Sequence, residues 1–444
     1  MPSSPTAVKE GSAEVVDRAE TDHHGRPTES GRAGFAGRVM ASMNVTTVAN
    51  LAPLLTSGLA VQIQDDLDFS DTALGVTVGG FFLIGALGSA ISGRVVERVG
   101  PEAALRLAAQ VTAAVLLCIG LFGRSWLLLT IFVACGGLAN AWAQPAANLY
   151  IARGVSPDRH GIALGIQKSG IPMAALLGGL AVPTLGLTIG WNWAFVVGGV
   201  LALAASSFIP TLVSTAVPGT NSMSSRGARE RPSGAPRPDL SVHLLVFLAV
   251  ATGLAACGSG ALGSFFVVSA VETGVSEAGA GVLLVGGSIV GIGARLLLGA
   301  SADQGSRNAW HTLTVMFVIA SLSFVALATG SRTWLLIAMP FVFATAFAWP
   351  GLYHLAVVRA NPSAPGAATG ITMTGSFTGA VSGPLIFGIL ADHASYRWAW
   401  SFAAVSMALS AVVMLAVSRL IPLPDRDVVH QSTETITDDL EEKS

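Results

Sequence analysis

A single lysine stands inside a long apolar stretch of the chain. Lys168 lies in GIQKSGIP, residues 165–172, whereas the other two lysines, Lys9 and Lys443, lie near the ends. A cation inside a membrane-spanning helix costs roughly 2.5–3.5 kcal/mol even on mild scales, so such residues commonly serve function. The ammonium could hold an anion, or it could exchange a proton, because burial disfavours its charged form. A structural lysine that only hydrogen-bonds nearby carbonyls is the alternative.

A counter-ion for Lys168 is hard to find in the sequence. All 26 acidic residues fall in tails, loops or predicted helix ends. Asp65 and Asp66, at the end of the first apolar block, are the carboxylates that could reach inward from such an end. We therefore expect the substrate to supply the negative charge, which predicts a small organic anion such as a carboxylate.

Polar residues with helical spacing could complete a site around Lys168. Asn140, Gln144 and Asn148 are four residues apart, so they share one face of a helix. Each polar residue alone is more typical of hydrogen bonding between membrane helices, but as a set around one lysine they indicate a substrate site. The other predicted members are Gln167, Thr345, Trp349, Tyr353, Thr372, Thr374, Asn44 and Asn50.

Composition shows which elements must position these residues. The chain has 444 residues, of which 52% are hydrophobic and 11% charged, whereas a soluble domain carries about 25% charged residues. Twelve blocks are long enough to cross a bilayer, which takes about 20 apolar residues. Since these blocks do not alternate as barrel strands do, we predict an all-α membrane protein with twelve transmembrane helices. The blocks are 39–63, 72–95, 102–123, 126–151, 161–184, 192–214, 241–268, 277–299, 310–330, 333–357, 366–390 and 398–420.

The polar segments divide the chain into two six-helix bundles. We predict a disordered tail (1–37) without a cleavable signal peptide, a first bundle (38–214), a Pro-, Gly-, Ser- and Arg-rich linker (215–240), a second bundle (241–421) and an acidic tail (422–444). Of the 24 basic residues, three (Arg124, Arg332 and Arg397) fall on one side of the membrane and Lys168 falls within it, which leaves 20 on the other side. Basic residues favour the cytoplasm, so both termini and the linker are predicted to be cytoplasmic, in the cell membrane.

The two bundles repeat one another. ANAWAQP (139–145) corresponds to ATAFAWP (344–350), and Gly161, Gly165, Gly170 and Gly178 correspond to Gly366, Gly370, Gly375 and Gly383. Two homologous halves are typical of secondary transporters, whose site lies between the halves near the membrane midplane. Pseudo-symmetric bundles that rock about such a site are therefore expected.

One loop sequence resembles a known family. GRVVERVGPEAAL (93–105) is similar to the G-x-x-x-D-R-x-G-R-R-x-x-x-L motif between helices two and three of the major facilitator superfamily, with Pro101 and Glu102 in place of the basic pair. The resemblance implies twelve helices, alternating access and a cytoplasmic gate in which the motif's acid meets a basic residue or a helix N-terminus. Packing glycines with solvated loop charges are the alternative. The implied gating residues are Gly93, Glu97, Arg98 and Gly100, and Arg295, Gly299 and Asp303 in the second half.

We therefore predict a secondary transporter of a small organic anion, coupled to protons. A drug or metabolite–proton antiporter is an alternative, because GIQKSGIPMAALLGG loosely resembles the superfamily's Gly-Pro-rich antiporter motif, although Ile171 separates Gly170 from Pro172. A receptor or scaffold without transport is a further alternative. Metal-ligand spacing, cofactor motifs and a nucleophile–base pair are not evident, so no metal, cofactor or enzyme activity is predicted. The expected partners are the lipid bilayer, the substrate and protons, with no nucleic acid, and the chain is expected to be a monomer.

Overall fold

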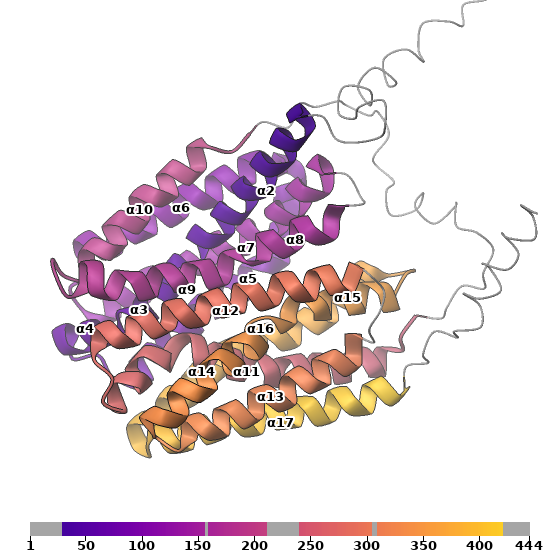
Figure 1. Ribbon diagram of the computed structural model, residues 1–444. Helices are drawn as coiled ribbons and strands as arrows, with labels where there is room; N and C mark the ends of the chain where they lie inside the picture. Colours follow the sequence, from indigo (N-terminus) through magenta and orange to yellow (C-terminus); the bar gives the residue numbers. More distant parts are fainter. Residues whose placement is uncertain (1–28, 156–158, 211–238, 304–308, 421–444) are drawn as a thin grey trace, which may run out of the picture.

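The protein is a bundle of long helices (Figure 1). A computed structural model describes residues 29–155, 159–210, 239–303 and 309–420, and their regular elements are all helical. Within these residues, ten helices are each long and apolar enough to cross a membrane, and a bent pair within residues 34–58 adds an eleventh span. The shorter apolar helix Trp191–Ser207 takes the remaining place in the chain order. The all-helical, twelve-segment membrane fold predicted from the sequence is confirmed.

The helices follow the predicted order in both halves. The N-terminal half consists of α2 (Glu29–Ala49), α3 (Leu51–Gly58), α4 (Ala60–Leu67), α5 (Asp71–Val99), α6 (Pro101–Phe122), α7 (Trp126–Gly154), α8 (His160–Lys168), α9 (Gly170–Ala181), a π-helical segment (Val182–Gly186) and α10 (Trp191–Ser207). The C-terminal half consists of α11 (Val242–Glu272), α12 (Glu277–Asp303), α13 (Ala309–Ala328), α14 (Arg332–Ala346), α15 (Trp349–Ala360), α16 (Pro365–His393) and α17 (Tyr396–Leu420).

The first helix begins earlier than the sequence indicated. Helix α2 starts at Glu29, so residues 29–37, predicted as part of a disordered tail, are helical. Phe35 packs with Ile166 against a small cluster that includes Val39 and Ile151, and this apolar contact extends the helix. Residues 1–28, most of the predicted linker (211–238) and the C-terminal tail (421–444) lie outside the described residues.

The two ends of the bundle differ in what they carry. At one end, here called the terminal end, lie the start of α2 and the end of α17, and the opposite end, here called the distal end, carries the short connections from α4 to α5 and from α16 to α17 (Figure 1). Large apolar side chains such as Leu297, Leu322 and Val412 are exposed on the outer surface of the bundle. Such a surface is suited to lipid.

Small residues let the two halves approach closely. A Cβ atom on Gly75 of α5 would collide with the backbone at Pro384 of α16, and one on Gly179 of α9 would lie 2.6 Å from the carbonyl oxygen of Gly281 of α12. Glycine permits this close backbone contact, as is common between membrane helices. The pairs α5–α16 and α9–α12 therefore form the interface between the halves.

Three spans are broken inside the bundle. The first bends by 54° between α2 and α3 at Asn50, the fifth breaks at Ser169, and the tenth breaks at Phe347 and Ala348. A proline follows each break and lacks the N–H group that a continuous helix needs. Helix α7 passes through its own proline unbroken, so the fourth and tenth spans differ here despite their similar sequences. The prolines are Pro53, Pro172, Pro350 and, in α7, Pro145.

Candidate functional site

Lys168 is the last residue of α8, at the break of the fifth span. Its Nζ donates a hydrogen bond to Oε1 of Gln144 on α7, at 2.6 Å, and its side chain is half-buried. Within the described part of the chain, Lys168 forms no ion pair with a carboxylate. The structure thus brings together two of the predicted site residues and leaves the lysine charge uncompensated by the described carboxylates.

A second cation lies at the same break. Arg295 of α12 is 7% exposed. Its Nε donates to the carbonyl oxygen of Phe347 at 2.8 Å, its Nη2 donates to the same oxygen, and its Nη1 donates to the carbonyl oxygen of Lys168. One guanidinium therefore joins the broken fifth span of the N-terminal half to the broken tenth span of the C-terminal half.

Prolines explain why these carbonyls need partners. In a continuous helix the N–H of residue i bonds the carbonyl of residue i−4, and Pro172, which lacks that N–H, leaves the Lys168 carbonyl for Arg295. Pro350 likewise leaves the carbonyl of Ala346, which accepts a 2.7 Å bond from Oγ of Ser259 on α11. The breaks are thus held by side chains of α11 and α12 in place of helical hydrogen bonds.

The broken helices also set the local electrostatics. The guanidinium of Arg295 lies at the C-terminal ends of α8 and α14, where the helix dipole favours a positive charge. Helices α9 and α15 begin on the other side of the same breaks, so their positive ends are there too. Discontinuous helices whose ends meet between two halves are the usual setting of substrate sites in secondary transporters.

Other predicted site residues form separate contacts in the N-terminal half. Nδ2 of Asn50 donates to Oδ1 of Asn140 at 3.4 Å, and Nε2 of Gln167 donates to Oγ1 of Thr46 at 2.9 Å. Oε1 of Gln167 is buried and has no partner among the described residues. These contacts join α7 and α8 to the first span.

The predicted residues of the C-terminal half lie mostly within that half's own packing. Trp349 and Tyr353 are buried in a row of aromatic rings, with centroids 5.9 Å apart, and Nε1 of Trp349 donates to Oγ of Ser259 at 3.0 Å. The hydroxyls of the three predicted threonines donate to carbonyls of their own helices, and two predicted asparagines are exposed. The threonines are Thr345, Thr372 and Thr374 of the C-terminal half, and the exposed asparagines are Asn44 and Asn148 of the N-terminal half.

Two residues near Lys168 were not assigned to the substrate site by the sequence. His354 of α15 has a buried Nδ1 without a partner among the described residues, and its ring interacts electrostatically with Lys168. Arg295 was assigned to the gate. The sequence did contain a signal that Arg295 lies inside the membrane. It stands eight residues before Asp303 and therefore ~12 Å inside the helix end.

Apart from Arg295, the predicted gate residues lie at the terminal end. Glu97 and Arg98 are exposed, and a Cβ atom on Gly93 or Gly299 would meet nothing within 4 Å. Gly100 has φ +91° and joins α5 to α6, which explains why a glycine stands there. The side chain of Asp303 lies outside the described residues.

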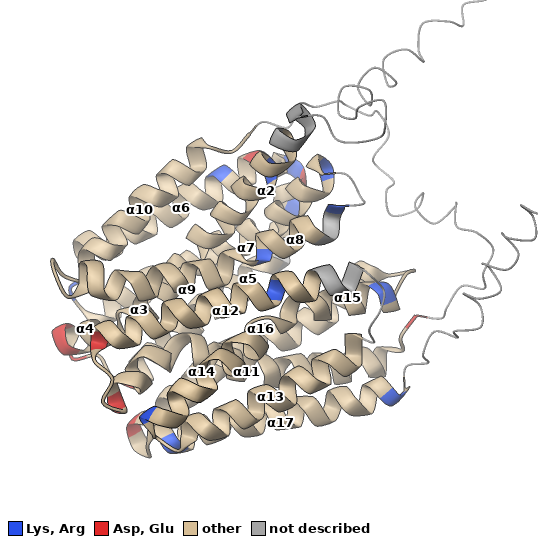
Figure 2. Cartoon of the chain, viewed as in Figure 1, with Lys and Arg blue, Asp and Glu red and all other residues tan. Residues whose placement is uncertain are grey.

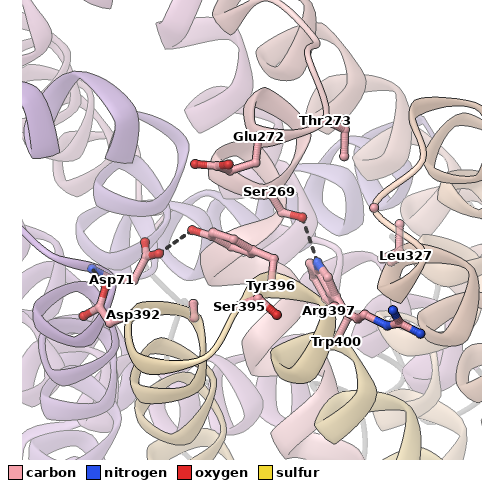
Figure 3. A pocket seen from close by; sticks show the side chains of 12 residues that line it. Asp71, Ser269, Glu272, Thr273, Leu327, Asp392, Ser395, Tyr396, Arg397 and Trp400 are labelled. Carbon is pink, nitrogen blue, oxygen red and sulfur yellow. Dashed lines mark hydrogen bonds between the residues drawn. The ribbon is translucent and has the colours of Figure 1, made fainter.

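The distal end carries a polar connection between the halves that we call the distal latch, formed by Asp71, Thr72, Asp392 and Tyr396. The carboxylate of Asp392, on α16, accepts bonds from the backbone N–H groups of Asp71 (3.1 Å) and Thr72 (2.7 Å), the first residues of α5. The hydroxyl of Tyr396 donates to Asp71 at 2.6 Å (Figure 3). Asp392 thus caps a helix N-terminus of the opposite half.

A cavity of about 510 Å³ adjoins the latch. It contains three carboxylates, from Asp71, Glu272 and Asp392, and a 2.7 Å bond from Nε1 of Trp400 to Oγ of Ser269 (Figure 3). Its lining comes from the distal ends of the helices, so it is separate from the break that holds Lys168. A further bond between the halves, from Gln62 of α4 to Glu277 of α12, also lies at the distal end.

Comparisons with known proteins agree with this architecture. Residues 34–339 and 248–436 match the Major Facilitator Superfamily. The chain is 30% identical over 208 residues to an MFS-type efflux pump of Mycolicibacterium smegmatis, a match that covers 45% of each protein. It is also 28% identical over 338 residues to an uncharacterized MFS-type transporter of Mycobacterium tuberculosis, covering 74% of this chain and 73% of that one.

Solved structures show the same fold. A bacterial homologue of the human lysosomal transporter Spinster, in an inward-facing and occupied conformation, is similar with a TM-score of 0.64 and 18% identity, over 86% of this chain and 96% of that one. The inward-facing and unoccupied conformation gives a TM-score of 0.60. The family match extends over most of the chain, and the chain therefore belongs to the major facilitator superfamily of membrane transporters.

Proposed function

We propose that this transporter moves a small organic anion across the cell membrane, and that the anion binds at Lys168. The observation that carries the proposal is the ammonium group of Lys168, which meets Gln144 at a helix break between the halves and has no carboxylate partner among the described residues. A cation within a membrane span is costly unless a counter-charge accompanies it. The substrate supplies that charge.

The contacts between the halves support an inward-facing state. The distal latch and the bond from Gln62 to Glu277 close the distal end, whereas Glu97 at the terminal end is exposed. With the termini in the cytoplasm, as the basic residues favour, the distal end faces outward. The site would then be reached from the cytoplasm in this state.

During transport, an acid near the end of α5 or α16 could cap the start of the other helix, at one end of the pair in each conformation. At the distal end, Asp392 near the end of α16 caps the start of α5. At the terminal end, Glu97 lies near the end of α5, and the start of α16 at Pro365 has no side-chain cap among the described residues. In the outward-facing state we expect Glu97 to cap α16 while Asp392 leaves α5.

Proton coupling is part of the proposal. Lys168 is the candidate proton carrier, because a half-buried amine beside a second cation can lose its proton when the anion leaves and regain it before the next anion binds. This exchange would link one proton to each transport cycle.

A drug or metabolite–proton antiporter is the second candidate function. The name of the Mycolicibacterium smegmatis relative, an efflux pump, supports it and favours export. Lys168 would then act mainly as the proton carrier, and substrate binding would not depend on its charge.

Ligand-dependent thermal stabilisation of the purified protein tests the proposal. We expect carboxylates to raise the melting temperature of the wild type and of Lys168→Arg, which keeps the positive charge, but not of Lys168→Met. Anion binding that is unchanged in Lys168→Met would rule out the proposed site. Drug binding that is unchanged in Lys168→Met, together with loss of proton-driven efflux in that variant and no anion binding in the wild type, would favour the exporter.

A further inference from the structure

Three nitrogen-bearing side chains converge on the helix breaks from both halves. Lys168 comes from α8, Arg295 from α12 and His354 from α15. Arg295 acts electrostatically on Lys168, and Lys168 acts on His354. In Figure 2 the acidic segments gather at the ends of the helices, whereas a basic segment lies well inside α12. The centre of the protein therefore carries more than one positive charge.

The hydrogen-bond donors of these groups are only partly used. A guanidinium has five N–H donors and an ammonium has three. Arg295 uses three donors, all on backbone carbonyls, and Lys168 uses one, on Gln144. Nδ1 of His354 has no partner among the described residues, and each of the two cations has two donors without a partner there. Such donors fit the oxygen atoms of anionic groups.

The charges are equally unbalanced. Among the described residues, every Asp and Glu of the helices lies in the first or last turn or in a connection, so no described carboxylate sits at the depth of Lys168 and Arg295. Two like charges that share a poorly solvated site repel one another, and each carries its own desolvation cost. A single negative charge would leave one of them unneutralised, whereas two negative charges would neutralise both.

We propose that the substrate is a small dianion of the dicarboxylate type, with one carboxylate at the ammonium of Lys168 and the other at the guanidinium of Arg295. This inference rests on the proposed function and specifies its substrate class. Because Lys168 and Arg295 belong to different halves, the dianion bridges them. In this structure Arg295 donates to the backbone carbonyl of Lys168. On binding, some of the guanidinium N–H groups would turn towards the second carboxylate.

Ligand pairs in which a second carboxylate replaces a terminal methyl group test the inference. Malonate, succinate and glutarate are each compared with the monocarboxylate of equal chain length, which is propionate, butyrate or valerate, on the purified full-length protein. The melting temperature is measured against ligand concentration to give Kd. We expect at least one dicarboxylate to bind about tenfold or more tightly than its partner, as close charge pairs in desolvated sites typically provide.

Variants of Arg295 assign the preference to that residue. In Arg295→Gln we expect the dicarboxylate to lose its advantage, so that it binds no more tightly than the monocarboxylate of equal chain length. Arg332→Gln, an exposed arginine at the start of α14, serves as the control and should keep the preference. Circular dichroism and gel filtration establish that the variants are folded. The comparison of the two ligand classes on the wild type is decisive even if a variant does not fold.

Each result separates the inference from the proposed function. Equal affinity for dicarboxylates and monocarboxylates in the wild type would overturn the dianion and leave the anion site standing. Failure of all six ligands to bind would overturn both. A preference that survives in Arg295→Gln would remove Arg295 from the site and so contradict the bridging role.

Discussion

Arg295 donates a hydrogen bond to the backbone carbonyl of Lys168, across the interface between the two halves of the protein. That carbonyl is available because Pro172, four residues later, has no N–H to bond it. The same guanidinium bonds Phe347 at the break of the tenth span. A single side chain of α12 thus holds both broken spans next to the proposed substrate site.

Replacing Pro172 tests whether the break matters for transport. In Pro172→Ala the new N–H can bond the Lys168 carbonyl, so α8 and α9 should merge and compete with Arg295. Because proline disfavours a helix interior by about 3 kcal/mol, we expect a melting temperature equal to or above that of the wild type. Transport in proteoliposomes should nevertheless fall about tenfold or more. Pro340→Ala, in the unbroken part of α14, is the control, and equal activity of the two variants would contradict the role of the break.

Ser259 is expected to stabilise the break of the tenth span. Its hydroxyl donates to Ala346 and accepts from Trp349, so Ser259→Ala leaves two buried polar groups without partners. Each such group costs about 1–3 kcal/mol, and thermal unfolding in detergent should report a clear loss. Ser264→Ala is the matched control, since that buried hydroxyl bonds only a carbonyl of its own helix in the described structure. Similar melting temperatures for the two variants would exclude the stabilising role.

The sequence predicted the architecture well because membrane insertion constrains each span separately. The apolar blocks had to be about 20 residues long, and the repeat fixed the division into two halves. The start of α2 at Glu29 was missed because it depends on a tertiary contact, the packing of Phe35 against the neighbourhood of Ile151 and Ile166.

The site was only partly predictable. Lys168 and Gln144, two members of the predicted set, are hydrogen-bonded to one another, and both could be singled out because an isolated lysine and a polar helix face are visible in the sequence. Arg295 was assigned to the gate because it lies in the second-half copy of the loop motif, and its depth in the helix was not used. Trp349 and Tyr353 have the right spacing to share a helix face, but spacing does not determine whether that face meets the other half or its own bundle, and they are buried within the C-terminal half.

The distal latch should set the balance between the two transport conformations. Asp392→Ala removes the two bonds that Asp392 accepts from the start of α5, while the helix keeps its own N-cap, Ser70. A capping contact is worth about 1 kcal/mol, so its loss should shift the populations roughly fivefold towards the outward-facing state. Asp392→Asn keeps a good capping group and should shift them much less. Spin labels on exposed distal positions, Thr188→Cys and Thr333→Cys, in a background without the three native cysteines, would report the opening as a longer distance. Equal distance distributions for both variants and the wild type would show that the cap does not hold the distal end closed.

Glu97 should act in the opposite direction at the terminal end. Its side chain is exposed in this structure, so Glu97→Ala should leave expression and the stability of the inward-facing state unchanged while abolishing transport, because the outward-facing state loses the cap on α16. The double variant Glu97→Ala with Asp392→Ala makes the test specific. If the two acids cap opposite ends of the same helix pair, the losses offset one another, and the spin-label distances return towards those of the wild type. If Glu97 is merely a solvated loop charge, the double variant will instead show the distances of Asp392→Ala alone.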